Sequence, residues 1–141
     1  VVNRAVDFIK MSSKNTIQLK SKNEKYFSNI DEEQMYRVFI NLIKNSEESF
    51  LDKKENNPHF KGIIDIEIDK NNDYIFIRFI DNGTGITDTK KVMTPYFTTK
   101  KTGTGLGLAI VSKIVNEHSG DFNISNNKSE GVTITISLPS L

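Results

Sequence analysis

The sequence contains no cysteine, only two histidines and only three prolines among 141 residues. Without cysteine, a disulfide framework and a thiolate metal site are both excluded, so the fold must rest on packing alone. His59 and His118 have no partner histidine, cysteine or carboxylate at metal-ligand spacing, and both are interpreted as structural residues. No serine stands in the elbow context of a hydrolase nucleophile, so a serine–histidine–acid triad has no support.

Charge of one sign and long apolar runs are also lacking. The formal net charge is +1 with acidic and basic residues interspersed, which is unlike the basic stripe of a nucleic-acid binder. No apolar run approaches the roughly 18 residues that cross a bilayer, and the N-terminus lacks a signal-peptide layout. A chain with 36% hydrophobic residues can bury a core as one compact domain. Because it begins without methionine, we expect a piece of a larger protein, with residues 1–13 as the tail of a preceding helix or linker and 14–141 as the domain.

Hydrophobic periodicity predicts the first elements. Residues 1–13 place apolar side chains at helical spacing, residues 16–20 alternate like a half-buried strand, and residues 26–30 suit a second short extended piece. Asp31 is a helix N-cap with Gln34 as its capping-box partner, so a helix is predicted from there to about residue 51. A polar loop is expected to follow, over residues 52–59.

The remaining elements form a predicted sheet and a second helix. Residues 63–68 and 74–80 flank the turn pair Asn71-Asn72 and predict a hairpin, whose second strand is apolar on both faces and should be central. A second helix and two further strands are predicted over 105–119, 121–125 and 132–138, with Gly120 as the helix stop. The fold class is therefore α+β, a two-layer sandwich with a mixed, mostly antiparallel sheet and helices on one face.

Two glycine-rich runs follow a strand and precede a helix, respectively. Asp81–Ile86 places a carboxylate at the end of a buried strand, where it can accept a hydrogen bond from an exocyclic amine. Gly103–Leu108 leads into a helix, and free N–H groups at a helix start suit phosphate. Taken alone, the first run could be an ordinary strand-ending turn, and a run like the second is more often a connector than a phosphate site.

Polar side chains near these runs are further candidates. Asn41 and Asn45 lie one helical turn apart, and a carboxamide oxygen suits magnesium, although both could simply face solvent. Lys100 could reach a terminal phosphate or be a solvated loop charge. The pair Tyr96-Phe97 places aromatic bulk in the polar segment 87–102, which is expected to be a mobile lid over the site.

Taken in order, these motifs resemble the catalytic ATP-binding domain of a sensor histidine kinase. The resemblance covers about residues 31–138 and is carried by Asn41 to Asn45, Asp81-x-Gly83-x-Gly85, the segment 94–100 and Gly103-x-Gly105-Leu106-Gly107-Leu108. The segment Thr94–Lys100 and the second glycine run are most similar to the nitrogen-regulation sensor kinases. The wider superfamily includes gyrase, the mismatch-repair ATPases and a heat-shock chaperone, and its fold is the Bergerat-type ATP-binding fold.

The resemblance implies roles for individual residues. Asn45 would coordinate Mg²⁺, with Asn41 and Lys100 completing the catalytic set, and Asp81 would accept from the adenine amine. Further contacts to ATP are implied for Gly83, Gly85, Ile86, Tyr96, Phe97, Gly103, Thr104, Gly105, Leu106, Gly107 and Leu108. Gly131 falls at the position of the family's last glycine. Val132 follows it where family members often have a hydroxyl residue that bridges to the base through water, and loss of that hydrogen bond should weaken binding by about 1 kcal/mol.

The implied activity is transfer of the ATP γ-phosphoryl group to a histidine in a dimerisation domain, because neither histidine here stands in a phosphoacceptor motif. Implied partners are that domain and a response regulator, with a monomeric isolated domain, a homodimeric parent, a cytoplasmic location and no nucleic acid. The parent is either soluble or anchored in the inner membrane. Two alternatives stay open: an ATP-hydrolysing clamp or chaperone of the same superfamily, and a non-catalytic nucleotide-sensing module.

Overall fold

The computed structural model describes residues 15–21, 25–85 and 107–141. Within them, two helices and five strands follow one another as β1 (Thr16–Ser21), α2 (Glu32–Asn56), β2 (Ile63–Lys70), β3 (Tyr74–Asp81), α3 (Gly107–Glu117), β4 (Asp121–Asn126) and β5 (Val132–Pro139). The predicted N-terminal helix over 1–13 and the lid over 87–102 lie outside the described residues. Neither described helix has the length and apolar character needed to cross a membrane.

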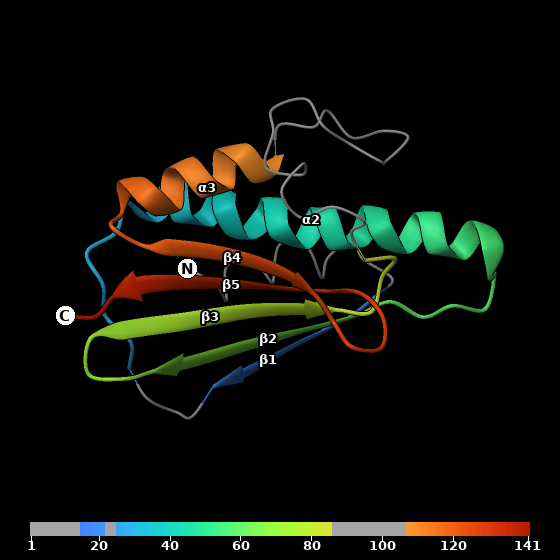
Figure 1. Ribbon diagram of the computed structural model, residues 1–141, viewed down its shortest axis with the longest axis horizontal. Coiled ribbons are helices and arrows are strands. Elements are labelled where there is room, and N and C mark those ends of the chain that lie inside the picture. Colours follow the sequence, from blue (N-terminus) through green and yellow to red (C-terminus); the bar gives the residue numbers. More distant parts are fainter. Residues whose placement is uncertain (1–14, 22–24, 86–106) are drawn as a thin grey trace.

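The sheet has the order β1-β2-β3-β5-β4, so β3 is its central strand as predicted. β1 pairs with β2 in parallel, whereas the other neighbours are antiparallel. Figure 1 shows α2 and α3 lying together over one face of this sheet. The α+β sandwich with a mixed, mostly antiparallel sheet is therefore confirmed.

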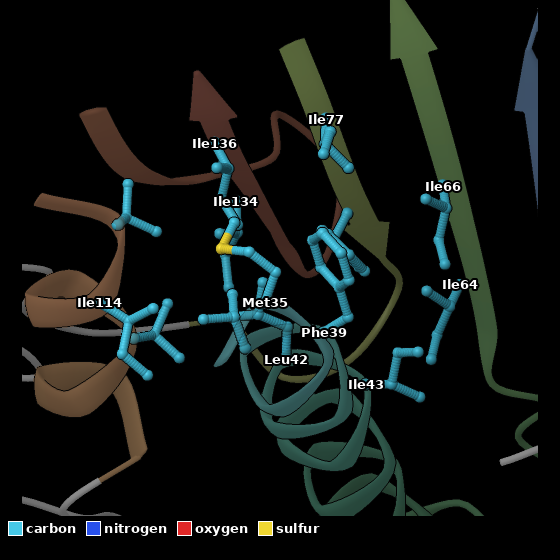
Figure 2. Close-up of a cluster of buried hydrophobic side chains, with 14 of the residues drawn as sticks. Met35, Phe39, Leu42, Ile43, Ile64, Ile66, Ile77, Ile114, Ile134 and Ile136 are labelled. Carbon is cyan, nitrogen blue, oxygen red and sulfur yellow. The ribbon is translucent and has the colours of Figure 1, made fainter. Parts of the chain in front are cut away.

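The core lies between the helices and the sheet. Alternate residues of β3 and β5 are buried because successive side chains of a strand point to opposite faces. Phe39 of α2 stacks on Phe79 of β3, with ring centroids 5.8 Å apart. Figure 2 shows these layers meeting, with Met35, Phe39, Leu42 and Ile43 of α2 directed at isoleucines of the strands and Ile114 coming from α3.

The start of α2 is tied to the end of α3. Asp31 caps α2 as predicted, because its Oδ1 accepts from the Gln34 N–H at 3.1 Å. The Asp31 N–H donates to His118 Nε2 at 3.0 Å, while His118 Nδ1 lies 2.8 Å from the Ile114 carbonyl oxygen. Since a carbonyl only accepts, Nδ1 is the donor in the second contact, and His118 joins the two helices as a structural residue.

Three sequence predictions need correction. Helix α2 continues to Asn56 rather than ending near Leu51, so the expected loop over 52–59 is mostly helical. Residues 26–30 form no strand; Tyr26 instead donates its hydroxyl to the Ile68 carbonyl at 3.3 Å. Helix α3 ends at Glu117 rather than near Ser119, and the residue with a positive φ is Ser119, at 59°. Gly120 follows this end and must be glycine, since a Cβ there would lie 2.4 Å from the Ser137 carbonyl oxygen.

Candidate nucleotide-binding site

The carboxylate of Asp81 is the best-defined polar group of the site. β3 ends at this residue, which is only 9% exposed. Ser46 Oγ donates to Oδ2 at 2.7 Å, while the backbone N–H groups of Gly83 and Val132 donate to Oδ1 at 3.0 and 3.2 Å. A carboxylate offers about four lone-pair sites, so three protein donors fix its orientation and leave room for one more donor.

Glycines let the backbone close around that carboxylate. Gly131 has a φ of 86°, and a Cβ there would lie 2.0 Å from the Asp81 carbonyl oxygen, so only glycine fits. A Cβ on Gly83 would lie 2.2 Å from Ser49 Oγ. Gly85 also has a left-handed φ, of 81°. The predicted run Asp81-x-Gly83-x-Gly85 is therefore a tight turn at the end of the central strand.

Ser49 fastens this turn to α2. Its Oγ accepts from the Thr84 N–H at 2.8 Å and lies 3.0 Å from Thr84 Oγ1. One turn earlier on α2, Ser46 holds Asp81 itself. Two hydroxyls at i and i+3 thus connect the helix to the strand end and to the turn that follows it.

The other end of the site brings Asn45 to the start of α3. A Cβ placed on Gly107 would lie 3.7 Å from both Oδ1 and Nδ2 of Asn45. The first N–H groups of a helix have no partner within the helix, and the helix dipole makes that end favourable for an anion. A neutral amide oxygen beside a phosphate site suits a magnesium ion, which takes few protein ligands and keeps several waters. The donor set therefore fits a magnesium nucleotide.

Other predicted site residues divide into two groups. Asn41 is partly buried one turn before Asn45 on α2, and Leu108 is partly buried against the core near the start of α3. The second group lies outside the described residues: Ile86, Tyr96, Phe97, Lys100, Gly103, Thr104, Gly105 and Leu106. Their roles remain predictions, as does that of Asn41.

Sequence reasoning missed four residues that shape the site: Ser46, Ser49, Lys53 and Asn127. Ser46 carried a readable signal, since it lies at i+4 from Leu42 and i−4 from Phe50 on the buried row of α2. A hydroxyl on an apolar row requires a buried partner, here Asp81. The departure at Val132 matters through the backbone, because its N–H reaches Asp81 directly while Thr133 donates to Asn127 Oδ1.

No cluster of three or more histidine, cysteine, aspartate or glutamate side chains that could hold a metal ion occurs within 15–21, 25–85 and 107–141. A magnesium ion held by one amide, phosphates and water needs no such cluster. The role of Asn45 as the metal ligand remains a prediction.

Comparison with known proteins places this site in a family. Residues 30–141 match the family described as histidine kinase-, DNA gyrase B- and HSP90-like ATPases. Sporulation kinase B of Bacillus subtilis is 38% identical over 111 residues, covering 77% of this chain and 24% of that protein. An NtrY-like sensor histidine kinase of Rickettsia felis is 38% identical over 121 residues, covering 79% of this chain and 19% of that protein. The chain thus spans about a fifth to a quarter of these relatives.

Solved structures agree with that placement. The catalytic domain of the histidine kinase ThkA superposes with a TM-score of 0.82 at 25% identity, covering 98% of this chain and 89% of that one. The mycobacterial sensor histidine kinase MprB superposes with a TM-score of 0.78, covering 99% of this chain and 91% of that one. Its identity of 19% means that this likeness concerns the fold alone. The chain belongs to the histidine kinase-, DNA gyrase B- and HSP90-like ATPase family. Within that family, the two relatives are named as a sporulation kinase and a sensor histidine kinase, and both structural neighbours are named as histidine kinases.

Proposed function

We propose that this chain is the catalytic domain of a sensor histidine kinase, which binds magnesium ATP and transfers its γ-phosphoryl group to a histidine of a separate phosphoacceptor domain. The observation that carries the proposal is the buried Asp81 carboxylate, held by three protein donors with acceptor capacity left over. Such a group selects a base with an exocyclic amine. Relatives named as sensor and sporulation kinases support the reaction class.

Each end of the site has a separate task. Asp81 would fix the base and so the position of the whole nucleotide, while the start of α3 at Gly107 would receive the phosphates. Asn45 would hold the Mg²⁺ ion, which supplies charge neutralisation when bound. Lys100 is proposed as an additional positive charge near the terminal phosphate.

Asn41 argues for a kinase rather than a hydrolase. In ATP-hydrolysing members of the superfamily a glutamate takes this place and activates water, whereas an amide cannot accept that proton. A positioned general base is worth about 10²–10⁴ in rate, so hydrolysis by this chain should be slow. An imidazole is itself a nucleophile and needs no such activation. The second candidate, an ATP-hydrolysing clamp, is therefore disfavoured.

The partners follow from the reaction. The chain requires a histidine-bearing dimerisation domain and, downstream, a response regulator that receives the phosphoryl group. We place the domain in the cytoplasm, where ATP is supplied. A monomeric isolated domain within a homodimeric parent is the arrangement proposed for the full protein.

The test is phosphoryl transfer in trans. The chain is mixed with magnesium ATP carrying a labelled γ-phosphate and with the separately produced phosphoacceptor domain of the parent protein. Acid-labile, base-stable label on that domain is the expected result, and the Asp81→Asn variant is the negative control. If the label is released instead as inorganic phosphate at a rate independent of the acceptor, the hydrolase is the better description.

A further inference from the structure

A cavity lies beside the turn that follows Asp81. It has a volume of about 520 Å³ and is lined by the last turns of α2, by Gly83 to Gly85 and by residues 126–131 between β4 and β5. Asp81, Ser46 and Asn45 do not line it. The cavity therefore shares Gly83 and Gly85 with the predicted contacts to ATP but does not include the Asp81 side chain, and residues 83–85 form one of its walls.

Lys53 lines this cavity and hydrogen-bonds to the turn that forms its wall. Its ammonium donates to the carbonyl oxygens of Asn82 at 3.0 Å and Gly83 at 3.4 Å, and to Glu130 Oε2 at 2.6 Å. An ammonium has three N–H donors, so these three acceptors occupy all of them. The Nζ atom also lies 4.6 Å from the ring centroid of Phe60. The side chain is only 19% exposed, which marks it as a fixed group rather than a solvated surface charge.

The two carbonyl groups belong to the segment that orients Asp81. Gly83 accepts from Lys53 through its carbonyl and donates through its N–H to Asp81 Oδ1 at 3.0 Å. Asn82 is held on its other side, because its Oδ1 accepts from the Ile63 N–H at 2.7 Å and its Nδ2 donates to the Lys61 carbonyl at 3.1 Å. Removing the ammonium would therefore free the carbonyl side of the turn whose N–H fixes the carboxylate.

Glu130 connects Lys53 to the opposite wall. In the same connection between β4 and β5, Asn127 Nδ2 donates to the Asp81 carbonyl at 2.9 Å and to the Glu130 carbonyl at 3.1 Å. Gly131 approaches Asp81 too closely for any side chain. The Glu130 side chain is 64% exposed, so its ion pair with Lys53 is screened by solvent. The contacts to the two carbonyl groups are the ones expected to matter more.

We propose that Lys53 is a positioning residue for the nucleotide base. By donating to the carbonyl oxygens of Asn82 and Gly83, it holds this turn and thereby the orientation of the Asp81 carboxylate. The proposal rests on the proposed function of this site as a nucleotide-binding site. In this proposal, a residue in the last turns of α2 affects base binding through Asp81, without contacting the base itself. Magnesium and the phosphates, at the other end of the site, should not depend on Lys53.

The test compares Lys53→Met with the unsubstituted chain. Methionine keeps an unbranched stem against Phe60 and removes all three donors. Without ligand, the Gly83 N–H should exchange with solvent at least about tenfold faster, because its turn is released. With ligand, the Kd values for magnesium ATP and for adenosine should both rise about tenfold, and preference for ATP over GTP should narrow. The ratio of Kd values with and without Mg²⁺ should stay unchanged.

Two further variants make the outcome decisive. Lys54→Met alters the next residue of α2, which shares none of the three contacts, and should leave exchange and affinity unaltered. Glu130→Gln keeps both carbonyl contacts and should weaken adenosine binding by less than about threefold, since it removes only the screened pair. If Lys53→Met does not fold, a loss of adenosine affinity of more than about threefold in Glu130→Gln would still overturn the proposal, because both carbonyl contacts are kept in that variant. A larger loss for Glu130→Gln than for Lys53→Met would overturn the proposal.

Equal Gly83 exchange rates and adenosine Kd values in Lys53→Met and the unsubstituted chain would also overturn it. Loss of affinity for magnesium ATP but not for adenosine would do the same, because Lys53 would then act at the phosphate end. Failure of the unsubstituted chain to bind adenosine or ATP would instead overturn the proposed function. The exchange measurement is made without ligand and would still decide whether Lys53 holds the turn.

Discussion

Asp81→Asn should separate folding from nucleotide binding. The asparagine Oδ1 can accept from the N–H groups of Gly83 and Val132 as the carboxylate does, at the observed 3.0 and 3.2 Å. Its Nδ2 then faces Ser46 Oγ, and a serine hydroxyl can rotate from donating to accepting. All three protein contacts can therefore survive, and the free energy of unfolding should fall by less than about 1 kcal/mol.

Binding should respond very differently to the same change. The acceptor left for the base becomes an N–H donor, which opposes the exocyclic amine of adenine. Loss of a hydrogen bond to a charged acceptor is worth about 1.5–3 kcal/mol, so the Kd for ATP should rise about 10- to 150-fold. Isothermal titration calorimetry gives the affinity, and urea unfolding gives the stability. The exposed carboxylate of Asp121 on β4 provides the matched control, Asp121→Asn.

Asp81→Ala is a poorer test because it strands three donors in a buried position. Each unsatisfied group costs about 1–3 kcal/mol, so the sum is about 3 kcal/mol or more. Domains of this kind are stable by only about 5–15 kcal/mol, and lost binding would then be indistinguishable from lost folding. If Asp81→Asn binds ATP as tightly as the unsubstituted chain, the proposed contact to the base is wrong. If Asp81→Asn unfolds, the assignment of its three protein contacts is wrong.

Three further changes probe other parts of the molecule. Asn45→Ala should remove most of the gain in ATP affinity that Mg²⁺ provides while leaving the Kd for adenosine within about twofold, as measured by calorimetry with and without the metal. Gly131→Ala should lower the free energy of unfolding by about 2 kcal/mol or more, because its φ is 86° and the new Cβ would lie 2.0 Å from the Asp81 carbonyl oxygen. Denaturant titrations measure this loss, and Gly107→Ala is the control, because the atoms nearest to its new Cβ lie at 3.7 Å. His118→Ala should cost about 1–3 kcal/mol, because it removes one hydrogen bond to the start of α2, from the Asp31 N–H, and one to the Ile114 carbonyl of α3. The exposed Lys113→Ala should cost less than about 0.5 kcal/mol in the same assay.

Local signals in the sequence located most elements. The Asp31 cap gave the start of α2, and the Asn71 turn gave the hairpin, where Asn71 Oδ1 accepts from the N–H groups of Asp73 and Tyr74 at 2.9 and 2.8 Å. The end of α2 was missed because residues 52–56 continue the helix without apolar periodicity. Lys53 explains why this polar turn is ordered, since its contacts lie 29 to 77 positions away along the chain.

Strand pairing also depended on distant contacts. The apolar residues on both faces of β3 predicted a central position, which the strand order confirms, although only alternate residues of β3 are buried. Periodicity carried no information that β1 pairs in parallel with β2 at the edge. Residues 26–30 were mistaken for a strand because Tyr26, Phe27 and Ile30 are residue types that favour strands, in a short run with no helical period. Their backbone instead meets the C-terminus, where the Leu141 N–H donates to the Phe27 carbonyl at 2.9 Å.

The two ends of the site differed in how readily sequence revealed them, for a physical reason. A phosphate site uses consecutive backbone N–H groups, so it leaves a short run of glycines before a helix, and on that signal Gly103–Leu108 is predicted to be one. The base end is assembled from single contacts between distant segments: Ser46 reaches Asp81 across 35 positions, and Val132 reaches it across 51. Substitutions in α2 or in the β4–β5 connection should therefore tune base selection while the glycine run stays intact. We therefore expect substitutions at one end of the site to change affinity for the base without changing affinity for the phosphates.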